Sequence, residues 1–305
     1  MSDAPPAEVV VTGAESGVRL DRLLARRWGV SRAEGRRLLE RGQVHVNGRV
    51  LRAADKALAM APGDRVRVAD FVPVALQLPI PEPGLDVPVL AEGEGWVVFD
   101  KPAGMPVHPL APDERGTLLN FAVARYPQLP GAGVGEGGLR SGVVHRLDVE
   151  TSGCLAIATT QPAWQTLRTH FREHTARKRY VALVHGQLTG HGRDDLWLHI
   201  AQHRPAKVRI ISERDARDTP GARRCTHTWR VLDAHDDRTL VEIDLHTGFL
   251  HQIRAAFAHR GHPVLGDPLY GHADAATRLM LHATSLVATP ASALAPTPPA
   301  FRVTS

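Results

Sequence analysis

The sequence predicts an α+β protein made of two units joined by an extended connector. Helical patterns followed by short alternating segments occupy residues 17–70, and apolar strand-like runs interleaved with helical patterns occupy residues 89–287. Between them, residues 71–88 hold five prolines, a density that breaks regular structure. We therefore expect a small domain, a Pro-rich linker and a large domain. An irregular Ala/Pro-rich tail is expected at residues 288–305.

The composition argues against several classes of protein. No apolar run approaches the roughly 18 residues of a membrane span, so we expect no membrane association. The first ten residues lack the basic start and the apolar segment of a secretion signal. The two cysteines, Cys154 and Cys225, lie far apart, which argues against a disulfide framework and favours the cytoplasm. The net charge of +5 suits a polyanionic partner.

The seventeen histidines do not indicate a metal site. Two pairs have helical i, i+4 spacing, His170 with His174 and His199 with His203. Neither pair carries the Glu of an H-E-x-x-H motif, and the chain has no Cys-x-x-Cys motif. We expect no bound metal.

The small unit carries signals for two helices and a hairpin. The first helix begins at residues 19–24, where three leucines share one face. The second helix has Ser31 as its N-cap and Glu34 as the capping-box partner, and it ends at Gly42. Asn47-Gly48 then predicts a tight hairpin between short strands.

The second helix of the small unit is rich in arginine. Its motifs run in the order Arg-Leu-Asp-x-x-Leu, Ser-Arg, Gly-x-Val-x-Val-Asn-Gly, Gly-Asp. This order resembles the small RNA-binding domain shared with a small-subunit ribosomal protein. The resemblance implies that Arg32, Arg36 and Arg37 contact RNA phosphates, which supply affinity more than base choice. The alternative is a solvated helix surface.

The large unit contains a charged interruption of an apolar pattern at residues 143–153. Val143 and Val144 predict the end of a buried strand, six polar or charged residues follow within eight positions, and residues 155–158 resume the apolar run. Charge inside a core is costly unless it is paired or used. The pattern alone leaves a functional site and a solvated surface turn about equally supported.

The order of residues in this segment decides between the two interpretations. His-Arg-Leu-Asp-x-x-Thr-Ser-Gly closely resembles the signature of the RluA-type pseudouridine synthases, with Glu150 where Asp is common. The resemblance implies that Asp148 is the catalytic nucleophile. It also implies that Arg146 fills the gap left by a flipped nucleotide, and that His145 and Leu147 contact the substrate.

Two later motifs extend the resemblance. Tyr180 matches the Tyr of a Lys-x-Tyr-x-Ala-x-Val-x-Gly strand that stacks on the target base, although a strand Tyr is most often core filler. Arg254 matches the basic residue that pairs with the catalytic Asp, a role compatible with a structural ion pair. Ile253 is expected to exclude water together with Leu147. Phe249-Leu250 departs from the family's usual Arg-Thr, so substrate choice is expected to differ.

Three other segments of the large unit have mainly structural interpretations. Residues 100–109 match the family's Asp-Lys-Pro loop beside the cleft, which we interpret as architecture. Residues 131–138 hold five glycines and predict a flexible loop without the pattern of a phosphate loop. Residues 161–174 predict a helix.

The resemblance covers residues 17–271 and implies a pseudouridine synthase fold with a mostly antiparallel mixed sheet and a central cleft. It implies that uridines in structured RNA are isomerised to pseudouridine without a cofactor, since the reaction needs neither a redox change nor a group donor. Large-subunit ribosomal RNA is the expected substrate and transfer RNA the alternative, and we expect a monomer. The step that Asp148 performs stays open among addition to uracil, attack on C1′ and removal of a ribose proton.

Two other classes of function remain as alternatives. A non-catalytic RNA-binding or ribosome-assembly factor is favoured only by the departure at Phe249-Leu250. A nucleoside hydrolase would typically use two carboxylates, and the second is missing from the motifs.

Overall fold

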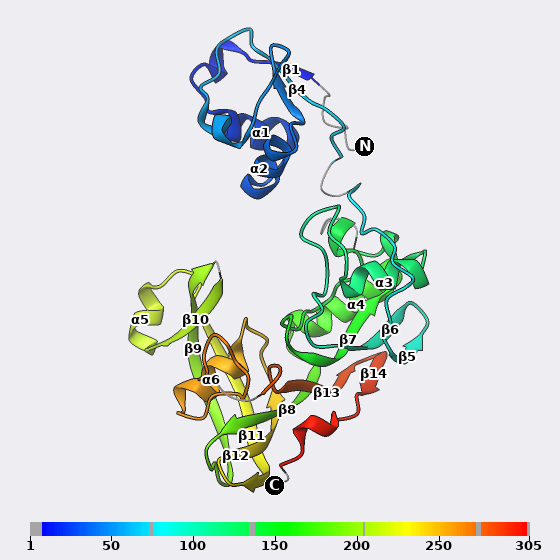
Figure 1. Ribbon diagram of the computed structural model, residues 1–305, viewed down its shortest axis with the longest axis vertical. Coiled ribbons are helices and arrows are strands. Elements are labelled where there is room, and N and C mark those ends of the chain that lie inside the picture. The colour runs from blue at the N-terminus through cyan, green and yellow to red at the C-terminus, as the bar shows by residue number, and fades with distance from the viewer. Residues whose placement is uncertain (1–7, 73–75, 134–137, 204, 273–275, 304–305) are drawn as a thin grey trace. The chain divides into compact units, whose positions relative to one another are not determined.

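The computed structural model describes residues 8–72, 76–133, 138–203, 205–272 and 276–303. The chain divides by its internal contacts after Gln77 into two compact units (Figure 1), and each unit has its own hydrophobic core. Among the helices in these ranges, none has both the length and the apolar composition that crossing a bilayer requires.

The small unit packs two helices against a four-stranded antiparallel sheet of order β1-β4-β2-β3. Its helices are α1 (Leu20–Trp28) and α2 (Arg32–Glu40), with short 3-10 turns η1 (Gly13–Glu15) and η2 (Ala53–Ala57). Its strands are β1 (Glu8–Val10), β2 (Val44–Val46), β3 (Arg49–Val50) and β4 (Arg65–Val68). The three leucines of α1 are fully buried, as their spacing predicts.

Local signals explain where these elements begin and end. Ser31 Oγ accepts a hydrogen bond from the Glu34 amide at 3.2 Å, which confirms the predicted N-cap. The predicted capping box is wrong, because the Glu34 carboxylate instead binds Arg37 and Gln77. The hairpin turn is confirmed by positive φ angles of 51° at Asn47 and 82° at Gly48.

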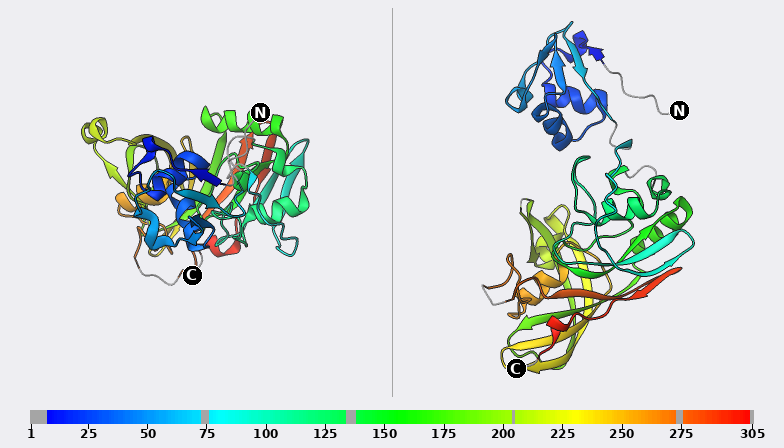
Figure 2. Two further views of the ribbon diagram at one scale, coloured as in Figure 1. Left: turned by 90° about the horizontal axis from the view of Figure 1, so that it is seen from above. Right: turned by 45° about the vertical axis from the view of Figure 1, so that its right-hand side comes forward.

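The large unit is built on a ten-stranded sheet of order β10-β9-β11-β12-β8-β13-β7-β6-β5, with β14 paired to β13. All neighbours are antiparallel except β13 and β7 (Figure 2), which confirms an α+β fold with a mostly antiparallel mixed sheet. Its strands are β5 (Val89–Gly93), β6 (Trp96–Lys101), β7 (Ser152–Ala158), β8 (Arg177–His185), β9 (His191–His203), β10 (Ala206–Ile211), β11 (Arg223–His235), β12 (Arg238–Leu245), β13 (Leu281–Ala288) and β14 (Ala291–Leu294).

Helices lie against separate parts of this sheet. Its helices and 3-10 turns are α3 (Leu118–Arg125), η4 (Leu129–Gly131), η5 (Gly138–Arg140), α4 (Gln161–Arg172), α5 (Glu213–Asp218), α6 (Gln252–His259) and η6 (Pro299–Phe301). Helix α4 packs near β7, and α6 packs near β9 and β10. Helix α4 also contacts β13, so the two helices pack on different parts of the sheet, separated by β11, β12 and β8.

Gly153 allows β7 to start against β13. Its φ is +110°, and a Cβ there would lie 2.2 Å from the carbonyl oxygen of Ala283. Only glycine fits a backbone approach this close. The glycine of the charged motif thus fixes the only parallel pair in the described sheet.

Two local predictions are wrong. A strand does not end at Val144. Val143 forms only an isolated β-bridge to Ile157. Its amide donates to the Arg140 carbonyl and its carbonyl accepts from Trp164 Nε1 at 3.3 Å, so neither group extends a strand ladder. The tail is not irregular throughout: β14 pairs with β13, and Phe301 is 1% exposed, because burying apolar side chains offsets the cost of ordering a Pro-rich segment.

Part of the predicted linker packs on the large unit. Asn120 Nδ2 donates to the Ile80 carbonyl at 2.8 Å, and Val87 is 3% exposed in the core of that unit. Residues 73–75 and 134–137, which belong to the predicted linker and the glycine-rich loop, lie outside the described residues.

Candidate active site

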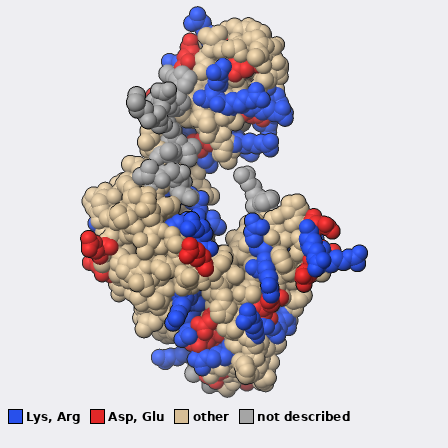
Figure 3. Space-filling view, turned by 180° about the vertical axis from the view of Figure 1, so that it is seen from behind, with Lys and Arg blue, Asp and Glu red and all other residues tan. Residues whose placement is uncertain are grey.

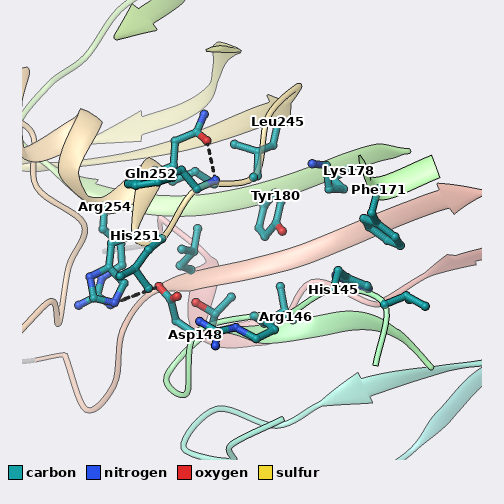
Figure 4. A pocket seen from close by; sticks show the side chains of 18 of the residues that line it. His145, Arg146, Asp148, Phe171, Lys178, Tyr180, Leu245, His251, Gln252 and Arg254 are labelled. Atoms are coloured by element: carbon teal, nitrogen blue, oxygen red, sulfur yellow. Dashed lines mark hydrogen bonds and ion pairs between the residues drawn. The ribbon is translucent and has the colours of Figure 1, made fainter. Parts of the chain in front are cut away.

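A cavity of about 350 Å³ opens over the middle of the large sheet, among the turn before β7, strand β8 and the start of α6 (Figure 4). It supplies the central cleft that the sequence predicts. All seven site residues predicted in the large unit line it, namely His145, Arg146, Leu147, Asp148, Tyr180, Ile253 and Arg254.

Asp148 lies in the turn before β7 and faces Arg254. Arg254 Nη1 donates to Asp148 Oδ2 at 3.3 Å, while Nε and Nη2 each bind the Asp267 carboxylate at 2.7 Å. Burial alone would lower the pKa of Arg254, but Asp267 and then Asp148 raise it above its ordinary value. Asp267 therefore fixes a charged guanidinium against the more exposed carboxylate of Asp148.

Asp267 is itself fully buried and firmly bonded. Its side chain has 0% exposure, and it accepts further hydrogen bonds from the amides of Leu269 and Tyr270. Burial would raise the pKa of Asp267, but the bonds and charge of Arg254 and the two amides hold it below its usual value. Asp267 is therefore an ionised anchor.

Lys101 supports the turn that carries Asp148. Its side chain is fully buried, and Nζ donates to the carbonyls of Pro102, Met105 and Val149 at 2.8, 2.8 and 2.9 Å. Three acceptors match the three donors of an ammonium group. Burial lowers the pKa of Lys101 to about 7, against the opposing effects of Glu150 and Asp148. The Asp-Lys-Pro loop is thus tied directly to the residue after Asp148.

His251 lies near Asp148 on the same side as Arg254 (Figure 4). It has a left-handed backbone with φ +51°, which is uncommon for a non-glycine residue and is found at functional sites. Its Nε2 lies 3.9 Å from Asp148 Oδ2, and its Nδ1 lies 3.1 Å from the Tyr270 hydroxyl. Burial lowers the pKa of His251, although Asp148 opposes this shift. A neutral imidazole at neutral pH follows.

The cavity has an apolar wall beside this polar cluster. Tyr180 is 7% exposed, and burial followed by the charge of Asp148 raises its pKa, so its hydroxyl keeps its proton. Leu147 and Ile253 are 8% and 4% exposed. The arrangement offers an aromatic face and aliphatic groups next to a carboxylate, which suits a flat, largely apolar group such as a nucleobase.

Phe249 and Leu250, the departure from the usual family motif, also line the cavity. They pack against a small core formed with residues of β9 and β10. The Tyr270 hydroxyl accepts from the Val208 amide of β10 at 2.8 Å. Phe249 and Leu250, together with Tyr270, therefore help to join the β9–β10 hairpin to the loop that carries His251.

His145 holds the turn in place. Its Nε2 accepts from the Ala156 amide at 3.0 Å, and its ring stacks on Phe171 with centroids 4.2 Å apart. Burial lowers the pKa of His145 to about 3, so the ring is neutral. Its hydrogen bond thus links the turn to β7, although the residue also lines the cavity.

The cavity is strongly positive. Besides Arg254, its lining includes four cations, Arg140, Arg146, Arg168 and Lys178. Asp148 is the only acidic residue among the described residues that line it. The charge balance favours a polyanionic ligand. Across the described ranges, no group of three or more His, Cys, Asp or Glu residues is placed to hold a metal ion.

The other three predicted residues lie on α2 of the small unit. Arg32 and Arg36 are exposed, and Arg36 pairs with Glu40 at 2.7 Å. Arg37 is partly buried and pairs with Glu34. Lys and Arg side chains gather on the visible face of the small unit (Figure 3).

Sequence reasoning missed several residues that build the site. Asp267 and Tyr270 stand in the segment Gly-Asp-Pro-Leu-Tyr-Gly at residues 266–271, and His251 stands three positions before Arg254. Lys101 was visible in the Asp-Lys-Pro loop. These residues were assigned no site role from the sequence, because their spatial partners could not be read from one sequence.

Comparison with known proteins gives consistent matches. The RNA pseudouridylate synthase family matches residues 95–259, and the S4 domain matches residues 18–70. An uncharacterized RNA pseudouridine synthase of Chloroflexus aurantiacus is 37% identical, over 88% of this chain and 80% of the relative. A ribosomal large subunit pseudouridine synthase D of Zymomonas mobilis is 35% identical, over 91% and 84%.

The solved structures agree on the fold. Human RNA pseudouridylate synthase domain containing 1 superposes with a TM-score of 0.58 at 23% identity. The superposition covers 72% of this chain and 89% of the human chain. At this identity the likeness supports the fold of the large unit.

Proposed function

The chain belongs to the RNA pseudouridylate synthase family, and from this and the site geometry we propose that it converts uridines of large-subunit ribosomal RNA with Asp148 as the nucleophile. The observation that carries the proposal is the contact of Arg254 with Asp148 in the lining of a positively charged cavity. Relatives named for the large ribosomal subunit support this choice of RNA.

The reaction is an isomerisation. The bond between ribose C1′ and uracil N1 breaks, the base turns, and C1′ bonds to C5, which gives up its proton while N1 gains one. Atoms and electrons balance without a donor or an oxidant, so we expect no cofactor. Three steps remain open to Asp148: addition to the ring, attack on C1′ and removal of a ribose proton.

The other site residues orient Asp148, stack on the target base and exclude water. Arg254, fixed by Asp267, orients Asp148 through the 3.3 Å contact. Tyr180 offers its ring for stacking on the target base, and Leu147 with Ile253 excludes water. Such a buried pocket requires the nucleotide to leave its helix, and stacking offsets part of that cost.

Arg146 is placed to assist base flipping. Its side chain is exposed, and it lies between His145 and Leu147 at the rim of the cavity. A guanidinium can occupy the gap that an extruded base leaves in a stack, since it stacks on aromatic faces and binds phosphates.

Residues 17–70 would serve as an RNA-binding domain, residues 71–88 as a linker and residues 89–287 as the catalytic domain. Arg32, Arg36 and Arg37 of α2 would neutralise phosphates. The two cysteines are both free and buried, which is consistent with a cytoplasmic enzyme. We expect the full chain to act as a monomer, which light scattering tests.

A direct assay tests the proposal. The purified wild type and Asp148→Asn are each incubated with transcribed, unmodified large-subunit ribosomal RNA and, separately, transfer RNA. We expect pseudouridine at defined ribosomal positions with the wild type alone, while both proteins bind RNA. Conversion of transfer RNA only would change the assigned substrate, and conversion by Asp148→Asn would contradict the assigned nucleophile. Release of free uracil would indicate hydrolysis instead.

A further inference from the structure

Lys178 is a partly buried cation without an anionic partner among the residues that the structure describes. It lies on β8 two positions before Tyr180, so both side chains face the catalytic cavity (Figure 4). Its Nζ donates to the Thr247 carbonyl at 3.3 Å, and within the described residues it forms no ion pair. Burial lowers the pKa of Lys178 to about 8, so the ammonium form prevails at neutral pH. Two of its three N–H groups are left for a ligand.

A second cavity of about 540 Å³ adjoins the catalytic cavity at this lysine. The two cavities share His174, Lys178 and Leu245 in their linings. The cavities meet at the end of the pairing between β8 and β12, where Arg179 and Asp244 form the last residue pair. Lys178 therefore lies at the boundary that the two cavities share.

The second cavity has the charge expected of a path for a polyanion. Its lining contains four further basic or imidazole side chains, those of His174, Arg177, Arg179 and His246. Its acidic residue Asp244 is bound by Arg179 at 2.8 Å, so its charge is compensated. Lys178 is the charged group that faces both hollows without such compensation.

We propose that Lys178 binds a backbone phosphate beside the nucleotide in the catalytic cavity, and that the second cavity receives the adjoining nucleotide. The inference rests on the proposed function, because it assumes that an RNA strand fills the catalytic cavity. A phosphate supplies the acceptors that the protein does not provide for this ammonium. Lys178 thereby sets where the strand leaves the site.

The test measures the salt dependence of RNA binding. Full-length wild type, Lys178→Met and Lys178→Arg bind a fluorescent single-stranded uridine 12-mer at 50 to 200 mM KCl. Removing one phosphate contact on a single strand reduces the slope of log K against log salt by about 0.7. We expect this reduction and about a tenfold weaker Kd for Lys178→Met, with the wild-type slope kept by Lys178→Arg. A wild-type slope for Lys178→Met overturns the proposal.

Matched variants keep the result interpretable. Arg230→Met removes a cation that lines neither cavity and pairs with Glu242 at 2.8 Å, and it should leave the slope unchanged. Lys178→Gln replaces Lys178→Met if the latter does not fold. The series is repeated with Arg32→Gln and Arg36→Gln added, which lowers the small unit's share of binding.

A parallel pseudouridine assay separates this inference from the proposed function. If the wild type modifies no RNA but Lys178→Met still shows the predicted loss of slope and Lys178→Arg does not, the function is wrong and the phosphate site stands. If the wild type modifies RNA and Lys178→Met keeps the full slope, the function stands and the phosphate site is wrong.

Discussion

The guanidinium of Arg254 binds the carboxylate of Asp267 through two hydrogen bonds of 2.7 Å, and this fork leaves Nη1 directed at Asp148. Arg254 is 4% exposed and Asp267 is 0% exposed. The pair is thus a buried support for the candidate nucleophile. A geometry this constrained makes the position of Asp148 depend on a residue that does not contact it.

Asp267→Asn should lower kcat by about 100-fold with a small change in KM, because a displaced Arg254 no longer orients Asp148. Breaking a buried pair should also reduce the free energy of unfolding by up to about 3 kcal/mol. Single-turnover kinetics and urea unfolding measure the two effects.

Asp195→Asn provides the control for this prediction. Asp195 forms the same fork with Arg224, at 2.8 and 2.6 Å, on an exposed surface. Its loss should cost less than about 1 kcal/mol and leave kcat unchanged. Wild-type kcat in Asp267→Asn would show that the fork does not position the nucleophile.

Stability should fall as the medium becomes acidic, because several histidines are buried in neutral form. Burial lowers the pKa of both His108 and His282 to about 4. In the unfolded chain these groups titrate near 6.5, so below that pH the unfolded state binds more protons than the folded state. The stabilisation is therefore complete above pH 6.5 and decreases toward pH 4. Each histidine contributes about 1.4 kcal/mol per pH unit in this window.

His282→Asn removes one of these titrations. The slope of unfolding free energy against pH between 6 and 4.5 should become smaller by about 1.4 kcal/mol per unit. His191→Asn, at an exposed position, should leave the slope unchanged. Equal slopes in wild type and His282→Asn would rule out this histidine as a source of acid sensitivity.

Gly153→Ala should destabilise the large unit by about 1–3 kcal/mol and reduce activity. The added methyl group would meet the Ala283 carbonyl at 2.2 Å, so β7 must shift away from β13 and move the preceding turn. Gly221→Ala is the control, because its φ of +83° carries similar backbone strain with no atom within 4 Å. Equal unfolding midpoints for the two variants would contradict the steric explanation.

Charge removal on α2 should reduce RNA affinity and its salt dependence. Arg32 and Arg36 are exposed, and each phosphate contact contributes roughly 0.7 on a single strand and 0.9 on B-form DNA to the slope of log K against log salt. The double variant Arg32→Gln, Arg36→Gln should therefore reduce the slope of log K against log salt by about 2. Arg37→Gln should also lower the stability of the small unit, because Arg37 pairs with the buried Glu34. An unchanged slope in the double variant would remove α2 from the interface.

Sequence reasoning recovered the elements that rest on local signals. The helix start at Ser31 and the Asn47-Gly48 turn depend on hydrogen bonds and backbone angles within a few residues. The strand predicted at Val144 failed, because the bonding partners of Val143 come from an adjacent turn and from α4. Strand β14 likewise forms by pairing with β13, and no local sequence pattern reveals this pairing.

In the candidate site too, the sequence indicated individual residues but not their contacts with distant parts of the chain. The motifs carried Asp148, Tyr180 and Arg254, and the structure places all three around one cavity. The fork between Arg254 and Asp267 joins residues 13 positions apart in the chain, and only Arg254 was assigned a role from the sequence. Lys101 was interpreted as architecture, and its three carbonyl bonds show which part of the site it supports.

The most direct test of the account is pseudouridine mapping of total RNA from the source organism after deletion of the gene, with the gene then restored as wild type or as Asp148→Asn. We predict loss of defined sites in large-subunit ribosomal RNA, recovered with the wild type and not with Asp148→Asn. Recovery with Asp148→Asn would contradict the assigned nucleophile. Sites lost only from transfer RNA, or no lost site in any RNA, would contradict the assigned substrate.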